Sequence, residues 1–97
     1  MEPTRTASKI RDILERELNP SHLEIVDHSA RHVGHPGADS GGGHFEIVVV
    51  SEQFDGLSRL AAQRLVYQAL GELMAHEIHA LSMRTFSSVQ WRAQPAG

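Results

Sequence analysis

The sequence predicts a single α+β domain in which helices cover one face of a three-stranded mixed sheet. Three observations predict this class: an amphipathic helical period near the N-terminus, three apolar runs of strand-like composition, and a second amphipathic stretch between the last two runs. A chain of 97 residues can bury one modest core. We therefore interpret residues 1–97 as one domain with a core of about 6–92 and the order α-β-β-α-β, followed by a short α-helix.

The first helix and the first strand follow from local patterns. Apolar residues recur every three or four positions over residues 6–18, which is typical of a helix with one buried face. Pro20 disfavours a helical conformation of Asn19, so the helix should end there. Alternation over residues 23–29, with β-branched residues in the middle, predicts a strand.

Residues 30–43 predict a long loop, because they are rich in Gly, Pro, Ser, Asp and His. Loops of this length are often functional or disordered. His32 and His35 lie inside it, and His44 lies beside it.

The second half of the chain predicts a strand, a helix and a strand. Residues 45–50 are almost continuously apolar, as in an interior strand. Ser58 is a suitable N-cap for a helix that should end near residue 75, with Gly71 as its weak position. Residues 78–86 form the third strand, and the helical crossover makes the last two strands parallel.

The C-terminal tail, residues 87–97, should hold a short helical turn around residues 89–91. The single tryptophan, Trp91, lies in this turn. We expect it to pack back on the domain, because a lone tryptophan is more often an anchor than a platform for a ligand.

Composition excludes several functions. The net charge of −3 gives no overall attraction to nucleic acid or anionic lipid, and the absence of cysteine excludes thiol catalysis and any cluster held by the chain's own thiolates. No nucleophile, base and orienting group are arranged as in an enzyme, and no Walker loop or serine elbow is present. No apolar stretch approaches the ~20 residues of a membrane span. We expect a cytoplasmic protein that is not an enzyme.

The histidines are the candidate metal ligands. His28, His32 and His35 have spacings of four and three, and His76 and His79 are three apart, as among zinc ligands. Histidines in such loops are more often only solvated. His79 lies inside an apolar strand, where a hydrogen-bonded core histidine is more common than a ligand. Alternation alone does not settle whether its side chain faces the core or an open edge.

Nucleic-acid binding is a further candidate function, with Arg59, Arg64 and Arg84 as the basic residues. Acidic residues lie among them, so no basic stripe emerges. The order of elements resembles a class II KH-like domain, but the Gly-x-x-Gly clamp is missing. Phe54-Asp55-Gly56-Leu57 stands in its place.

Four blocks of residues resemble the BolA family in their order and distances. The resemblance extends from about Ile10 to Trp91, and the joint occurrence of the blocks is specific. The blocks are LEIVD at 23–27 with Ser29 and HVGH at 32–35, HF at 44–45 leading into VVVS at 48–51, FDGLS at 54–58 followed by QRLVYQAL at 63–70, and IHALS at 78–82 followed by Trp91.

The resemblance implies the architecture predicted above and a partner, a monothiol glutaredoxin. It implies a shared [2Fe-2S] cluster, with thiolates from the glutaredoxin and glutathione and imidazoles from this chain. The invariant histidine of the family falls on His79, and the loop ligand falls on His32, with His35 as the alternative. Some relatives have a cysteine in the loop, whereas this chain has only histidines. Because neutral imidazole must coordinate, protonation below about pH 6 should compete with ligation.

The resemblance also implies an alternative function. Bacterial members are associated with stress-dependent morphology and with DNA-binding transcriptional control through the second helix and the strand after it. A third hypothesis is that the loop histidines bind zinc or nothing, and that the protein acts only as an apo-partner. When free, the chain should be a monomer or a weak dimer.

Overall fold

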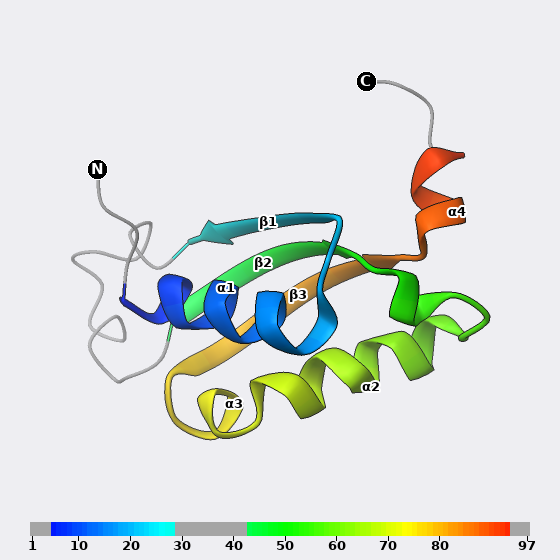
Figure 1. Cartoon of the computed structure of the whole chain (residues 1–97). Coiled ribbons are helices and arrows are strands. Elements are labelled where there is room, and N and C mark those ends of the chain that lie inside the picture. Colours follow the sequence, from blue (N-terminus) through cyan, green and yellow to red (C-terminus); the bar gives the residue numbers. More distant parts are fainter. Residues whose placement is uncertain (1–4, 29–42, 94–97) are drawn as a thin grey trace.

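The computed structural model describes residues 5–28 and 43–93. The elements confirm the predicted α+β class, and their order is compatible with a class II KH-like arrangement (Figure 1). Among the described residues, no helix is long and apolar enough to cross a bilayer. The elements are α1 (Arg5–Leu18), β1 (His22–Asp27), β2 (Gly43–Val50), the 3₁₀ turn η3 (Glu52–Phe54), α2 (Arg59–Leu70), α3 (Glu72–His76), β3 (Ile78–Phe86) and α4 (Ser88–Arg92).

The sheet has the strand order β1-β2-β3. β1 pairs antiparallel with β2, and β2 pairs parallel with β3, so β2 is the interior strand and the predicted parallel pair is confirmed. This pairing brings the end of β1 and the starts of β2 and β3 to the same end of the sheet. The predicted loop leaves from and returns to this end. Residues 29–42 lie outside the described residues, and Gly43 already belongs to β2.

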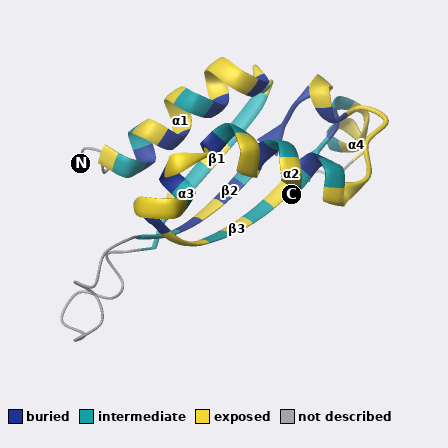
Figure 2. Cartoon of the chain, turned by 90° about the horizontal axis from the view of Figure 1, so that it is seen from below, coloured by how far each residue is buried: buried dark blue, intermediate teal, exposed yellow. Residues whose placement is uncertain are grey.

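One face of the sheet carries the core. Phe45, Ile47 and Val49 alternate along β2 and are buried beneath α1 and α2. Ile10 of α1 and Val66 of α2 are each fully buried in the same cluster. Figure 2 shows these helices covering the sheet, with their exposed sides turned away from it. Burial of this stripe on each helix explains the sequence periodicity.

Local chemistry sets the helix ends. α1 ends at Leu18, and Asn19 adopts a positive φ of 45°, a conformation that asparagine tolerates better than most residues. The Ser58 side chain accepts a hydrogen bond from the Ala61 amide at 3.1 Å, which confirms the predicted N-cap.

The prediction of one helix extending to about residue 75 is wrong. The chain turns at Gly71, whose φ of 47° favours glycine, and a separate short helix, α3, follows. The sequence pattern continues across the break because both helices bury apolar residues in the same core: Leu70 ends α2 and Leu73 lies in α3.

The other face of the sheet is covered at one end by α4. Trp91 stacks on His22 with a centroid separation of 4.8 Å and contacts the Phe86 ring at 5.2 Å. Val50 pairs with both His22 and Phe86 in the strand register and is fully buried. The expected packing of Trp91 is therefore confirmed, and a capping box between Ser87 and Gln90 begins the helix that carries it.

Replacing Trp91 with alanine should destabilise the fold by about 2 kcal/mol, because the contacts of its ring with His22 and Phe86 are lost. Urea unfolding followed by far-ultraviolet circular dichroism measures this change. Val89→Ala is the matched control, since Val89 lies on the same helix and is 64% exposed. Equal unfolding midpoints for the two variants would contradict the assigned role of Trp91.

Candidate functional site

Three histidines lie at the end of the sheet where β1 ends and β2 and β3 begin. The His28 amide donates a hydrogen bond to the His44 carbonyl at 2.8 Å. On the other side of β2, His44 pairs with Ala80 of β3, which directly follows His79. We call this group, His28, His44 and His79, the histidine end of the sheet. It adjoins both ends of the 29–42 segment.

A shift in strand register determines where His79 lies. Gly43 pairs with Ile78 but His44 pairs with Ala80, so His79 is an extra residue, as in a β-bulge. In a regular strand, His79 would share the face of Leu81, which packs against the core. The shift releases it from that face.

His79 is consequently exposed, and the core-histidine interpretation is wrong. Its ring stacks on the His44 ring with a centroid separation of 5.1 Å and an angle of 18° between the planes. The stacking limits the orientations of an otherwise exposed imidazole. His79 is therefore a positioned nitrogen donor at the surface of the molecule.

The side chain of Glu77 links α1 to the strand that carries His79. Its carboxylate accepts hydrogen bonds from the Lys9 ammonium at 3.0 and 3.2 Å and from the Thr6 hydroxyl at 3.1 Å. These hydrogen bonds, that of Lys9 first, hold the pKa of Glu77 below its ordinary value. The first helix is thereby tied to the start of β3.

The backbone of Glu77 makes two further links. Its amide donates to the Leu73 carbonyl at 2.9 Å, which closes α3, and its carbonyl accepts from the Gly43 amide at 3.0 Å, which joins it to β2. Glu77 thus contacts α1, α3 and β2 two positions before His79. These contacts hold the backbone on both sides of the histidine stack.

The histidine end does not form a complete metal site from the described residues. None of their His, Asp and Glu side chains gather in a group of three that could hold a metal ion. The lone pair of a ring nitrogen lies in the ring plane, so the nearly parallel rings of His44 and His79 would have to turn before both could bind one ion. The ring of His28 lies 3.1 Å from a Glu46 carboxylate oxygen. The arrangement offers one exposed imidazole and needs other donors.

Metal ligation by His79, His32 and His35 stays a prediction. His79 lies at the surface, where a partner can reach it, whereas His32 and His35 lie outside the described residues. His44 was missed as a site residue. The signal that could have identified it is the strand pairing, because parallel strands at 45–50 and 78–86 begin side by side.

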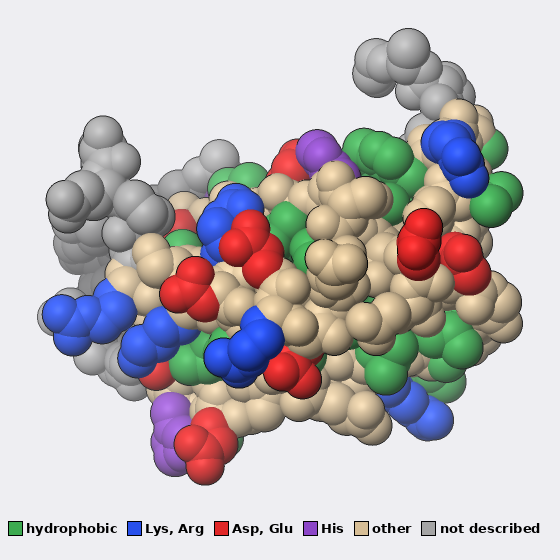
Figure 3. Space-filling model, in the orientation of Figure 1, with side chains coloured by type: hydrophobic (Ala, Val, Ile, Leu, Met, Phe, Trp, Pro, Cys, Tyr) green, Lys and Arg blue, Asp and Glu red, His purple; other side chains and the backbone are tan. Residues whose placement is uncertain are grey.

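The three predicted nucleic-acid contacts do not share one face. Arg64 lies five residues after Arg59 on α2, which turns it by about 140° around the helix axis. Arg84 pairs with Val48 and lies on the sheet face opposite the helices. On the side shown in Figure 3, basic and acidic side chains are interspersed.

The fold and the site define a small α+β domain with an exposed histidine at the edge of its sheet. The sequence profile of the family described as BolA-like protein matches residues 14–90. The chain belongs to the BolA family.

Three relatives illustrate the match. BolA-like protein 1 of Bos taurus is 42% identical over 86 residues, which cover 89% of this chain and 62% of the bovine protein, so this chain spans about three fifths of that relative. The DNA-binding transcriptional regulator BolA of Vibrio cholerae is 37% identical over 86% of this chain and 79% of its own length. The structure of BolA1 from Arabidopsis thaliana is 34% identical with a TM-score of 0.76, covering 98% of this chain and all of that one.

The link between Lys9 and Glu77 should make stability depend on pH. The pKa of Glu77 is lower in the folded state, so its contribution is fully present above the ordinary glutamate value of about 4.3 and is lost as the pH falls through the lower folded-state value. The difference in unfolding free energy between the wild type and Glu77→Gln should therefore be largest near neutral pH and vanish in acid. Both side chains are partly exposed, so the difference should be small and should shrink with salt.

Urea unfolding at a series of pH values checks this expectation. Glu15→Gln is the matched control, because it removes an exposed pair with Arg11 within one helix. A Glu77→Gln difference that grew as the pH fell would show that the sign is wrong.

Proposed function

We propose that this chain is a non-enzymatic partner of a monothiol glutaredoxin and shares a bridging [2Fe-2S] cluster with it. The observation that carries the proposal is the exposed, stacked imidazole of His79 at the histidine end of the sheet. The chain has no cysteine, so thiolate ligands must come from another molecule. A single exposed imidazole in a chain without thiols suits a metal site whose other ligands come from a second molecule.

His79 and His32, with His35 as the alternative to His32, would supply the imidazole nitrogens, and the glutaredoxin and glutathione would supply the thiolates. His32 is four residues after His28, so chain length alone keeps it within about 14 Å of the histidine end. Mixed ligation by imidazole and thiolate is established chemistry for such clusters and raises the reduction potential. When bound, the cluster would supply one-electron transfer or iron and sulfide for delivery.

The residues around His79 have separate tasks in this proposal. His44 restricts the orientation of the imidazole ring by stacking on it, and the contacts of Glu77 hold the backbone that bears the ring. His79 must be neutral to donate a lone pair, so acid should release the shared cluster. Mutation of a residue that orients a metal ligand, as His44 would orient His79, typically changes metal affinity by about 10–100-fold.

The test is anaerobic reconstitution of the wild-type chain with a monothiol glutaredoxin, glutathione, iron and sulfide. His79→Ala should abolish or change the visible absorption and circular dichroism of the shared cluster, because a ligand is lost. His76→Ala is the matched control, since His76 is also exposed and lies three residues away. His44→Ala should keep a cluster but make its loss in acid begin at a higher pH.

An unchanged spectrum for His79→Ala would refute the ligand assignment. A complex that forms equally well without iron and sulfide, and takes up none when they are added, would instead support an apo-partner.

DNA-binding regulation is the second candidate function, and it is favoured by the name of the Vibrio cholerae relative. It predicts an affinity for duplex DNA that falls steeply with salt, because each phosphate contact releases counterions. Arg59→Glu combined with Arg64→Glu should lower this affinity at least tenfold and flatten the salt slope, as measured by fluorescence anisotropy. Unchanged binding by the double variant would argue against α2 as the DNA surface, and Arg84→Glu tests the opposite face.

A further inference from the structure

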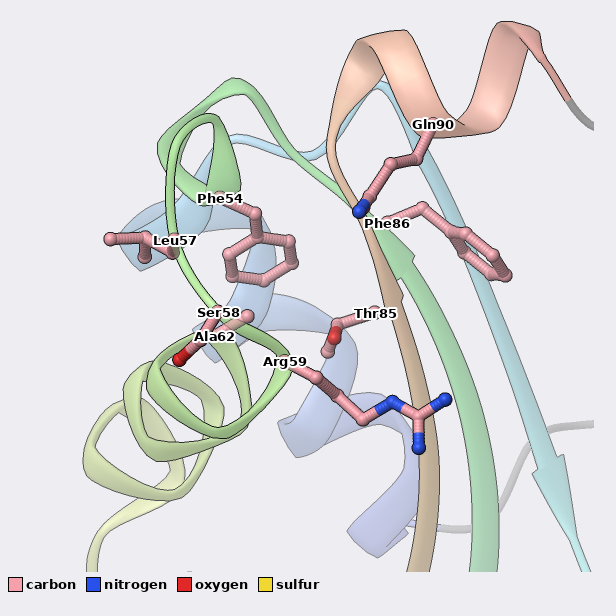
Figure 4. Close-up of a pocket in the computed structure, with 8 residues that line it drawn as sticks. All are labelled: Phe54, Leu57, Ser58, Arg59, Ala62, Thr85, Phe86 and Gln90. Carbon is pink, nitrogen blue, oxygen red and sulfur yellow. The ribbon is translucent and has the colours of Figure 1, made fainter.

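A pocket of about 220 Å³ lies between the start of α2 and the end of β3, at the opposite end of β3 from His79. Figure 4 shows the Phe54 ring inside it, with Thr85 and the side-chain nitrogen of Gln90 across from the ring and Arg59 along one border. The Phe86 ring turns away, toward Trp91. The pocket therefore has an apolar wall and a polar wall.

The polar wall carries hydrogen-bonding groups that have no partner among the described residues. The hydroxyl oxygen of Thr85 is buried and has no hydrogen-bond partner. The guanidinium of Arg59 makes no hydrogen bond or ion pair with any residue that the structure describes. A buried hydroxyl without a partner is unfavourable in a folded protein, and where it borders a pocket a bound molecule can supply the missing hydrogen bond.

Gln90 contributes a donor with a fixed direction. The side-chain oxygen of Gln90 accepts a hydrogen bond from the Ser87 backbone amide at 2.8 Å. The two N–H groups of the Gln90 side chain therefore remain for a ligand. The first turn of α2, which Ser58 caps, adds a positive field at the same place. The guanidinium, the hydroxyl and the amide together offer hydrogen-bond donors to an anion.

The surrounding charges decide which anion fits. Glu52 and Asp55 are exposed on either side of Phe54. Near the pocket, the chain therefore carries two carboxylates and the single cation of Arg59 within eight residues. That balance opposes the repeated charge of a nucleic-acid backbone, whose binding requires several cations. A single carboxylate needs only one, and Arg59 can bind it through two parallel hydrogen bonds.

We propose that this pocket binds one carboxylate of a partner protein, with the carbon chain that bears it lying on Phe54. The volume suits a single amino-acid side chain or the last residue of a chain. The site is separate from the histidine end, so the inference does not depend on cluster ligation. A partner bound at both places would lie along β3, which is an edge strand of the sheet.

The test uses the whole chain and the α-amide of N-acetyl-leucyl-glutamate, which carries one carboxylate, as the probe, with N-acetyl-leucyl-glutamine amide as the uncharged analogue. Amide signals of Thr85 and Gln90 in nitrogen-15 spectra should shift in a saturable way with the glutamate probe, and the analogue should bind at least tenfold more weakly. Arg59→Gln should weaken the probe at least fivefold. Arg11→Gln, an exposed arginine of α1, is the control and should leave binding unchanged.

A second variant separates binding from folding. Thr85→Val keeps the shape of the side chain and removes the hydroxyl, so it should raise the unfolding midpoint while weakening the probe. Equal binding of the two probes, or an unchanged affinity in Arg59→Gln, would overturn the proposal. If dodecathymidylate competed with the glutamate probe and bound with a lower dissociation constant than the probe, the pocket would be assigned to nucleic acid instead.

Discussion

The structure depends on the pairing of β2 with strands on both sides, antiparallel to β1 and parallel to β3. β2 is the most continuously apolar segment, and its core-facing residues are almost completely buried, so it can only be the central strand. Once it is central, the two pairings leave no choice about where the other strands begin and end. The end of β1 and the starts of β2 and β3 must meet. Residues as far apart in sequence as His28 and His79 become neighbours because of this single constraint.

The register shift at the start of β3 adapts that scaffold to a site. A regular strand would place the imidazole of His79 over the core, where a polar ring needs a partner. The extra residue turns it outward at the cost of one disturbed pairing, and Ile78 remains buried on the core side. Glu77 restrains the same place through α1, α3 and β2. The contacts of Glu77 therefore restrain the backbone on both sides of the register shift.

The sequence predicted the strands, the parallel pair, the cap at Ser58 and the packing of Trp91, because each is set by local periodicity or by one strongly apolar surface. It did not predict the break at Gly71. Apolar periodicity continues across the break, and a glycine inside a helix differs from a glycine that ends one only in the φ that the tertiary structure selects. Nor did it settle the side on which His79 lies. Alternation assumes regular pairing, and a bulge is a property of two strands together.

The two ends of β3 differ in chemistry in a way that follows from what covers the sheet. Trp91 and α4 cover one face of the sheet at the far end, and Arg59, Thr85 and Gln90 line the pocket next to α2 there. The near end has no such cover among the described residues, and its histidines lie on the open face. Six residues of strand, about 20 Å, separate His79 from Thr85. A partner that contacted both places would pass along the edge of β3 that pairs with no other described strand, where strand-to-strand hydrogen bonds are available to it. The edge that isolated sheets must normally protect would then be the line along which this domain is recognised.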